Sequence, residues 1–122
     1  MTAISRYPVP ELADLPEDTA VGVMDLPNGA SIVMGEVIVT QAFNAETADI
    51  VDVGDSGSAN RYLNDGNIRA LGRVALVPTG FVNTGKTTIT LTRDKTGAAP
   101  TQGKLILRVG FVIKGRTYEV FE

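Results

Sequence analysis

The sequence contains no cysteine, no histidine and no tryptophan, and only 6% of its 122 residues are aromatic. Without cysteine and histidine there can be no disulfide, no zinc site of the usual ligands, and no catalytic arrangement that needs a thiol or an imidazole. A basic excess is also lacking, since the formal net charge is −3, whereas proteins that bind a nucleic-acid backbone carry basic stripes. No apolar run approaches the length of a membrane span. We therefore expect neither a nucleic-acid nor a membrane partner.

The composition favours β-structure. There are thirteen glycines and six prolines, together with many valines, isoleucines and threonines. No window shows the sustained three-and-four spacing of apolar residues that is typical of an amphipathic helix. The length fits one domain with one core. These features predict an all-β domain.

The segment 104–114 is expected to be the central strand. Its alternate positions are apolar, and side chains of a strand point to opposite faces in turn. The apolar positions are Leu105, Leu107, Val109, Phe111 and Ile113. Such a face needs a second layer to cover it.

A second long strand is expected over 31–43, with apolar residues on both faces. One face is predicted to hold Val33, Val37, Val39 and Phe43, and the other Ile32, Met34, Ile38 and Ala42. Apolar groups on both faces indicate an interior position in a sheet or a strand also covered by a partner.

Five shorter strands complete the expected fold. They are predicted over 19–24, 49–54, 73–78, 86–93 and 116–121. The segment 54–66 is expected to be an irregular loop held by Tyr62 and Leu63, and 67–71 a single helical turn. About seven strands at roughly ten-residue spacing indicate a sandwich or a barrel.

Residues 1–19 are predicted to be an extended, proline-rich arm, and residues 20–122 the β-domain. The arm is too apolar for a freely solvated tail. Its apolar residues are Ile4, Tyr7, Val9, Leu12 and Leu15. The arm either covers an edge of its own domain or packs on a neighbouring subunit.

The segment from Gly80 to Thr87 matches the phosphate-binding pattern G-x-x-x-x-G-K-[ST]. That loop requires a helix directly after it, because the amides of the helix N-terminus face the phosphates. Here the following residues are β-branched and alternating, which predicts a strand. We expect no nucleotide, no other cofactor and no catalytic residues.

The acidic and basic side chains form no pattern typical of a site. The aspartates Asp49, Asp52, Asp55 and Asp65 do not have the spacing of a calcium loop, and aspartates in such turns usually bond their own backbone. We expect no metal. The cations Arg69, Arg73, Lys86 and Arg93 are interpreted as a solvated face.

From residue 25 onward the order of landmarks resembles that of capsid cement or head-decoration proteins of tailed bacteriophages. The similar segments are 26–30 (LPNGA), 37–44 (VIVTQAFN), 52–55 (DVGD), 61–63 (RYL), Thr101 with Gly103, and 114–116 (KGR). The resemblance covers about three quarters of the chain and is one of turns and strands, not of a catalytic signature.

The resemblance implies a jelly-roll-like antiparallel β-sandwich of about seven or eight strands. The extended N-terminal arm has no matching landmarks and is inferred from composition alone. The resemblance also implies a non-enzymatic virion protein that is made in the host bacterial cytoplasm and binds the outer capsid surface. The expected partners are the major capsid protein and further copies of this chain, as a homodimer or homotrimer. The arm and the 54–66 loop are the expected contact regions, with candidates Ile4, Tyr7, Val9, Leu12, Leu15, Asp55, Arg61 and Tyr62. The alternative is a carbohydrate-binding or receptor-binding sandwich of a phage tail or fibre.

Overall fold

The computed structural model describes residues 2–9, 19–97 and 102–113, and for residues 2–9 and 95 the backbone alone. Within these residues the chain forms eight strands and no helix, and hence no helix that could cross a membrane. The strands are β1 (Thr2–Val9), β2 (Val21–Leu26), β3 (Ala30–Gln41), β4 (Ala48–Asp55), β5 (Ser58–Asn67), β6 (Gly72–Ala75), β7 (Thr87–Thr96) and β8 (Lys104–Ile113).

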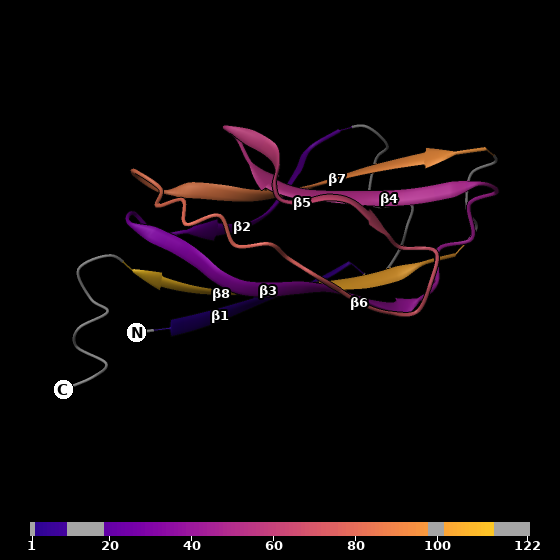
Figure 1. The fold of residues 1–122 in the computed structure, drawn as a ribbon, viewed down its shortest axis with the longest axis horizontal. Helices are drawn as coiled ribbons and strands as arrows, with labels where there is room; N and C mark the ends of the chain where they lie inside the picture. Colours follow the sequence, from indigo (N-terminus) through magenta and orange to yellow (C-terminus); the bar gives the residue numbers. More distant parts are fainter. Residues whose placement is uncertain (1, 10–18, 98–101, 114–122) are drawn as a thin grey trace.

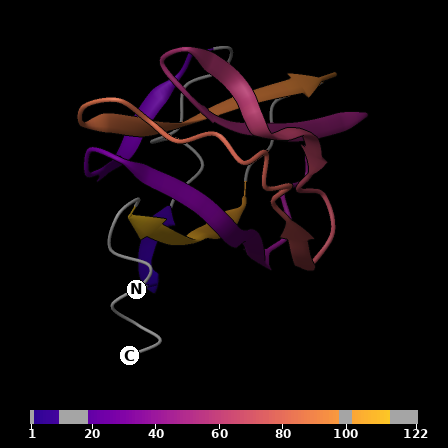
Figure 2. The ribbon, with the colours of Figure 1, turned by 60° about the vertical axis from the view of Figure 1, so that its left-hand side comes forward.

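The eight strands form two stacked antiparallel sheets (Figure 1). The β1 sheet has the order β1-β8-β3-β6, and the β2 sheet has the order β2-β7-β4-β5. The two layers remain separate in the view turned by 60° (Figure 2). The first strand pairs with the last, and the pairing continues inward along the chain: β1 pairs with β8, β2 with β7, β3 with β6, and β4 with β5. This is one long antiparallel ribbon rolled onto itself, so the expected jelly-roll-like β-sandwich is confirmed.

The segment predicted as central does lie inside a sheet. Strand β8 has β1 on one side and β3 on the other. Leu105, Leu107, Val109 and Phe111 are buried, and Ile113 packs against the core from a partly buried position. The β2 sheet supplies the cover that this apolar face needs, with Val51, Val53, Ile89 and Leu91 almost wholly buried.

The face assignment in the first part of β3 was wrong. Val33 was predicted to share a face with Val37, but Val33 is exposed, whereas Val37 and Ile32 are both buried. The reason is a β-bulge, because Ile32 pairs with Phe111 while Met34 pairs with the next residue of β8, Gly110. Val33 is the extra residue, and one extra residue reverses the faces of those around it.

The segment 54–66 is not an irregular loop. It contains the end of β4, a tight turn at Ser56–Gly57 and most of β5. Tyr62 and Leu63 are buried, as expected. The helical turn predicted over 67–71 is absent, because these residues are the end of β5 and the connection to β6. The strand predicted over 116–121 lies outside the described residues.

In the N-terminal segment, β1 is a regular strand. It pairs with β8 over eight residues, from Thr2 opposite Val112 to Val9 opposite Leu105. This part of the predicted arm therefore occupies an edge of the β1 sheet in its own chain. Residues 10–18 lie outside the described part.

Candidate contact surface at the β4–β5 turn

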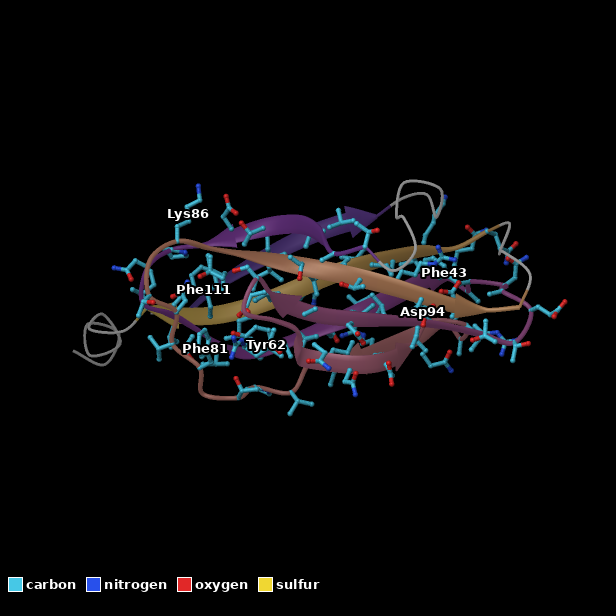
Figure 3. All side chains as sticks on the ribbon, turned by 90° about the horizontal axis from the view of Figure 1, so that it is seen from above. Phe43, Tyr62, Phe81, Lys86, Asp94 and Phe111 are labelled. Atoms are coloured by element: carbon cyan, nitrogen blue, oxygen red, sulfur yellow. The ribbon has the colours of Figure 1, made fainter. Side chains whose placement is uncertain are left out.

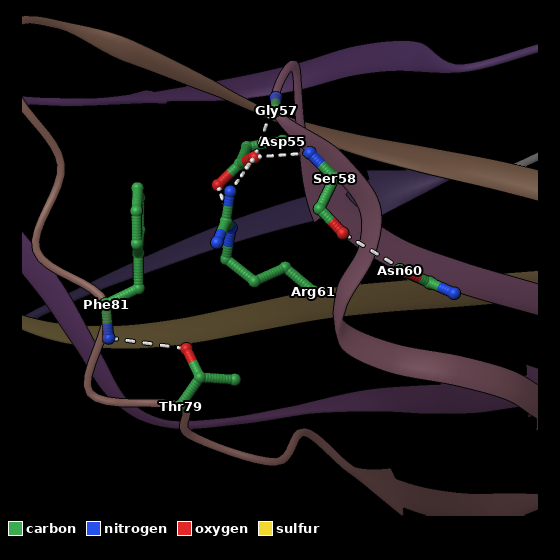
Figure 4. Close-up of polar contacts among 7 residues, drawn as sticks. All are labelled: Asp55, Gly57, Ser58, Asn60, Arg61, Thr79 and Phe81. Carbon is green, nitrogen blue, oxygen red and sulfur yellow. Dashed lines mark hydrogen bonds and ion pairs between the residues drawn. The ribbon is translucent and has the colours of Figure 1, made fainter.

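The turn that joins β4 to β5 is organised by one carboxylate. Asp55 pairs with Ser58 across a two-residue turn. Its Oδ1 atom accepts hydrogen bonds from the backbone amides of Gly57 and Ser58, each at 3.0 Å (Figure 4). Aspartate favours such turns because its short side chain can accept hydrogen bonds from the backbone amides that the turn leaves unpaired. We call the end of the sandwich that holds this turn the tip end.

The same carboxylate binds a guanidinium group from β5. Arg61 Nε donates to Asp55 Oδ2 at 2.7 Å, and Arg61 Nη2 donates to Oδ1 at 3.2 Å. The side chains of Asp55 and Arg61 are 3% and 21% exposed. The Asp55 carboxylate thus accepts four hydrogen bonds from donors of its own chain. This makes it a structural anchor rather than a general base.

Arg61 also connects the turn to the loop that precedes β7. Its guanidinium carbon lies 3.7 Å from the centre of the Phe81 ring (Figure 4). A cation over an aromatic face is worth about 0.5–2 kcal/mol. Phe81 remains 37% exposed, so its other surface is open to solvent.

The 79–86 loop is fixed to the start of β3. Val82 forms an isolated bridge with Ser31. The Asn83 backbone amide donates to the Ala30 carbonyl at 3.0 Å, and the Ala30 amide donates to Asn83 Oδ1 at 2.6 Å. The loop then enters strand β7 and not a helix. The strand predicted after the loop is therefore confirmed, whereas the phosphate-binding pattern requires the N-terminus of a helix at this position.

These elements enclose a shallow hollow of about 190 Å³ at the tip end, which we call the tip hollow. It is lined by Asp55, Ser56, Gly57, Arg61, Phe81, Asn83, Thr84 and Thr87. Figure 3 shows Phe81 and Lys86 near this end and Phe43 near the other. Exposed apolar side chains occur on the same elements, at Val82 in the loop and at Val33 in the bulge. A surface that combines apolar groups with a fixed guanidinium is typical of protein contacts.

Three contact residues were predicted near this turn, Asp55, Arg61 and Tyr62, and the structure brings the first two into contact. Asp55 and Arg61 form the ion pair, with only Arg61 partly exposed. Tyr62 points into the core and is 3% exposed, so its ring is not open to a partner or a sugar. Burial, and then the Asp55 charge, raise the pKa of Tyr62, while the Arg61 charge partly offsets them.

The candidates in the N-terminal segment lie elsewhere. Ile4, Tyr7 and Val9 belong to β1, which adjoins β2 at one side of the sandwich. The Asp55–Arg61 pair belongs to β4 and β5, at the side where β5 adjoins β6. Leu12 and Leu15 lie outside the described residues. The predicted contact residues are therefore not brought together on one surface.

The four aspartates considered for calcium do not form one cluster of carboxylates. Asp49 forms an ion pair with Arg93, Asp52 accepts the backbone amide of Asp65 at 2.7 Å, and Asp55 binds Arg61. Asp65 itself has a φ of +58°, in the left-handed region, at a bulge of β5. No group of three or more acidic residues in the described part of the chain could hold a metal ion.

The interpretation of Arg93 as part of a solvated face was wrong. Its side chain is 6% exposed, and its Nε lies 2.9 Å from Asp49 Oδ1. Arg69 is fixed as well, since its guanidinium donates to the carbonyl oxygens of Ala45, Glu46 and Thr47. Arg73 and Lys86 are exposed.

The sequence analysis did not predict that Phe81, Val82 and Asn83 help to form the surface at the tip end. In the sequence these residues lie between Gly80 and Gly85 of the phosphate-loop pattern, which does not assign a role to their side chains. The available signal was an aromatic and a β-branched residue side by side in a glycine-rich loop, where apolar side chains have little local reason to occur.

No family model matches the sequence, and no curated protein matches it. Solved structures do match. The first is a chain in the cyanophage Pam1 capsid asymmetric unit, with a TM-score of 0.73 and 20% identity, covering 92% of this chain and 84% of that one.

Two further chains match to a similar extent. One belongs to the acid-stable capsid structure of Helicobacter pylori bacteriophage KHP30, with a TM-score of 0.70, 16% identity and coverage of 90% and 86%. The other belongs to the capsid of Ralstonia phage GP4, with a TM-score of 0.69, 16% identity and coverage of 93% and 84%. At these identities the likeness is one of fold, and it extends over at least nine tenths of this chain and more than four fifths of each matching chain.

Proposed function

We propose that this protein is a structural component of a bacteriophage virion, and more specifically a non-enzymatic decoration protein on the outer surface of the capsid. The observation that carries the proposal is the structural match. Chains from three phage capsid structures share this fold over at least nine tenths of the present chain, although at most 20% of residues are identical. The resemblance in the order of turns and strands supports the same assignment.

The surface of the molecule suits attachment to a repetitive shell. The contact elements proposed here are the tip hollow with Arg61, Phe81 and Val82, and the N-terminal segment with Ile4, Leu12 and Leu15. Tyr7 and Val9 are left out of the proposal, because the register sets them opposite the core residues Leu107 and Leu105. Each contact of this size is weak alone, but a dimer or trimer on neighbouring capsomers multiplies weak contacts through effective concentration. Contacts that span two capsomers would oppose their separation.

The test is binding to heads assembled from the major capsid protein encoded in the same genome and prepared without this chain. Purified protein should cosediment with these heads, saturate at a fixed ratio to the capsid protein, and raise the temperature at which the heads open. Heads that neither bind the protein nor gain heat resistance would refute the proposal.

A pair of variants tests whether the tip end makes the contact. Val82→Asp places a charge on the exposed apolar surface beside the tip hollow, and Leu71→Asp places one on an exposed residue in the β5–β6 connection. We expect Val82→Asp to weaken binding at least tenfold and Leu71→Asp to leave it within about twofold, since burying an unpaired charge in an interface is strongly unfavourable. Equal binding of the two variants would remove the tip end from the contact.

A further inference from the structure

The outward face of the β1 sheet contains a second, larger hollow. Its volume is about 320 Å³, and it is lined by Met34, Gly35, Glu36, Arg73, Arg108 and Gly110. We call it the outer hollow. Glu36 and Arg108 pair across β3 and β8, and they alternate along these strands with the buried residues Val37, Leu107 and Val109. The outer hollow therefore lies on the side away from the core.

The floor of the outer hollow depends on a glycine. Gly110 is paired with Met34, and a Cβ at Gly110 would lie 2.5 Å from Met34 Cγ. The missing side chain lets Met34 lie across β8 while about half of its surface stays exposed. Methionine is flexible and polarisable, and adapts to the apolar side chains of a partner.

The charges around the outer hollow do not balance. Arg73 Nη1 donates to both carboxylate oxygens of Glu36, at 3.2 and 3.3 Å, and Arg108 Nη1 donates to Oε2 at 3.4 Å. Two guanidinium groups thus share one carboxylate, which leaves one positive charge. On the other side of β8 the register sets Arg6 opposite Arg108, and β1 contains no acidic residue.

Both guanidinium groups keep donors that no described residue engages. An arginine side chain offers five N–H groups, and the contacts with Glu36 use only Nη1 of each arginine. Among the described residues no acceptor binds Nε or Nη2 of Arg73 or Arg108. Their side chains are 65% and 37% exposed, against 18% for Glu36. A second carboxylate could therefore reach both arginines from solvent.

We propose that the outer hollow receives an acidic side chain, Asp or Glu, of a partner protein, with an adjoining apolar residue of the partner packed on Met34. A second carboxylate would neutralise the pair of arginines and could bind one of them through two parallel hydrogen bonds. A nucleic-acid backbone fits less well, because one net positive charge on a chain of net charge −3 offers no stripe of cations. The proposal rests on the proposed function for the identity of the partner, which is the capsid shell.

The test uses charge reversal at the more exposed arginine. Arg73→Glu should bind the heads described above at least tenfold more weakly than the wild type. Lys104→Glu is the matched control, since it makes the same charge change at an exposed residue of β8 outside the outer hollow, and should bind within about twofold of the wild type. Arg73→Lys keeps the charge but loses the planar fork of the guanidinium group, so its affinity for the heads should lie between those of the other two variants. Circular dichroism and urea unfolding check that each variant is folded.

The outcomes separate this proposal from the function on which it rests. If the wild type does not bind heads, the proposed function fails. If the wild type binds and Arg73→Glu binds as well as Lys104→Glu, the outer hollow is not a contact, although the proposed function stands. If Arg73→Glu instead changes the mass measured by light scattering and leaves head binding unchanged, the occupant is a second copy of this chain and the proposal is overturned.

Discussion

Replacing Asp55 by alanine tests whether one carboxylate holds the tip end together. The change removes two charge-assisted hydrogen bonds from Arg61 and leaves the amides of Gly57 and Ser58 without their acceptor. Removing one member of a buried ion pair costs about 3–5 kcal/mol, because the remaining charge is left without compensation. Arg61 keeps some contact with water, so we expect the lower end, about 3 kcal/mol of unfolding free energy. For a domain of this size that corresponds to a fall in Tm of about 10 °C.

Urea unfolding, followed by circular dichroism, measures this loss. Asp55→Asn should lose less than Asp55→Ala, because an amide oxygen can still accept the two turn amides while the ion pair is gone. A double-mutant cycle with Arg61→Met should give a coupling energy of about 1–3 kcal/mol. Asp25→Ala is the control, since it breaks only solvent-exposed contacts, the pair with Lys86 and a hydrogen bond from Thr88 Oγ1, and should lower the unfolding midpoint far less than Asp55→Ala does. If Asp55→Ala unfolds at the same urea concentration as the wild type, the anchoring role is refuted.

Two further predictions concern buried ionisable groups. Arg93→Met should cost about 3–5 kcal/mol of unfolding free energy, because the buried Asp49 carboxylate loses the Arg93 guanidinium. The double variant with Asp49→Leu should recover much of that loss in urea unfolding. A double variant that is no more stable than Arg93→Met would contradict this. The raised pKa of Tyr62 means that the folded state holds this proton to higher pH than the unfolded state does. Stability should therefore be unaffected below pH ~10 and fall as the pH rises through the raised pKa, and a matched urea series should show a smaller fall for Tyr62→Phe. An equal fall in both proteins would count against the burial effect.

The parts of the fold that the sequence allowed us to predict are those whose local pattern agrees with their final environment. Strand β8 alternates over nine residues and lies between two strands with one face in the core. The β-branched run after Lys86 forms β7, as its alternation predicted. In each case side-chain alternation, backbone propensity and burial favour the same structure.

Strand β5 was missed because its local pattern does not agree with its environment. It is an edge strand rich in asparagine, and only Tyr62 and Leu63 along it are large buried side chains. A bulge at Asn64 and Asp65 also breaks the alternation. Its strand conformation comes from pairing with β4, which is a tertiary contact that no local pattern reveals. The burial of Arg93 was hidden for the same reason, because its partner Asp49 is distant in sequence.

The bulge at Val33 connects the main error in the sequence analysis with the outer hollow. In an unbroken strand with Val37 directed to the core, Val33 would also point inward, and Ile32 would point outward beside Met34. The extra residue reverses that order, so that Ile32 fills the core opposite Phe111. Met34 and Glu36 meanwhile remain on the outward face, where Gly110 and Arg108 pair with them. Because β3 changes register at Val33, it can fill the core at the tip end and still keep Met34 and Glu36 on the outward face, where the proposed contact would form.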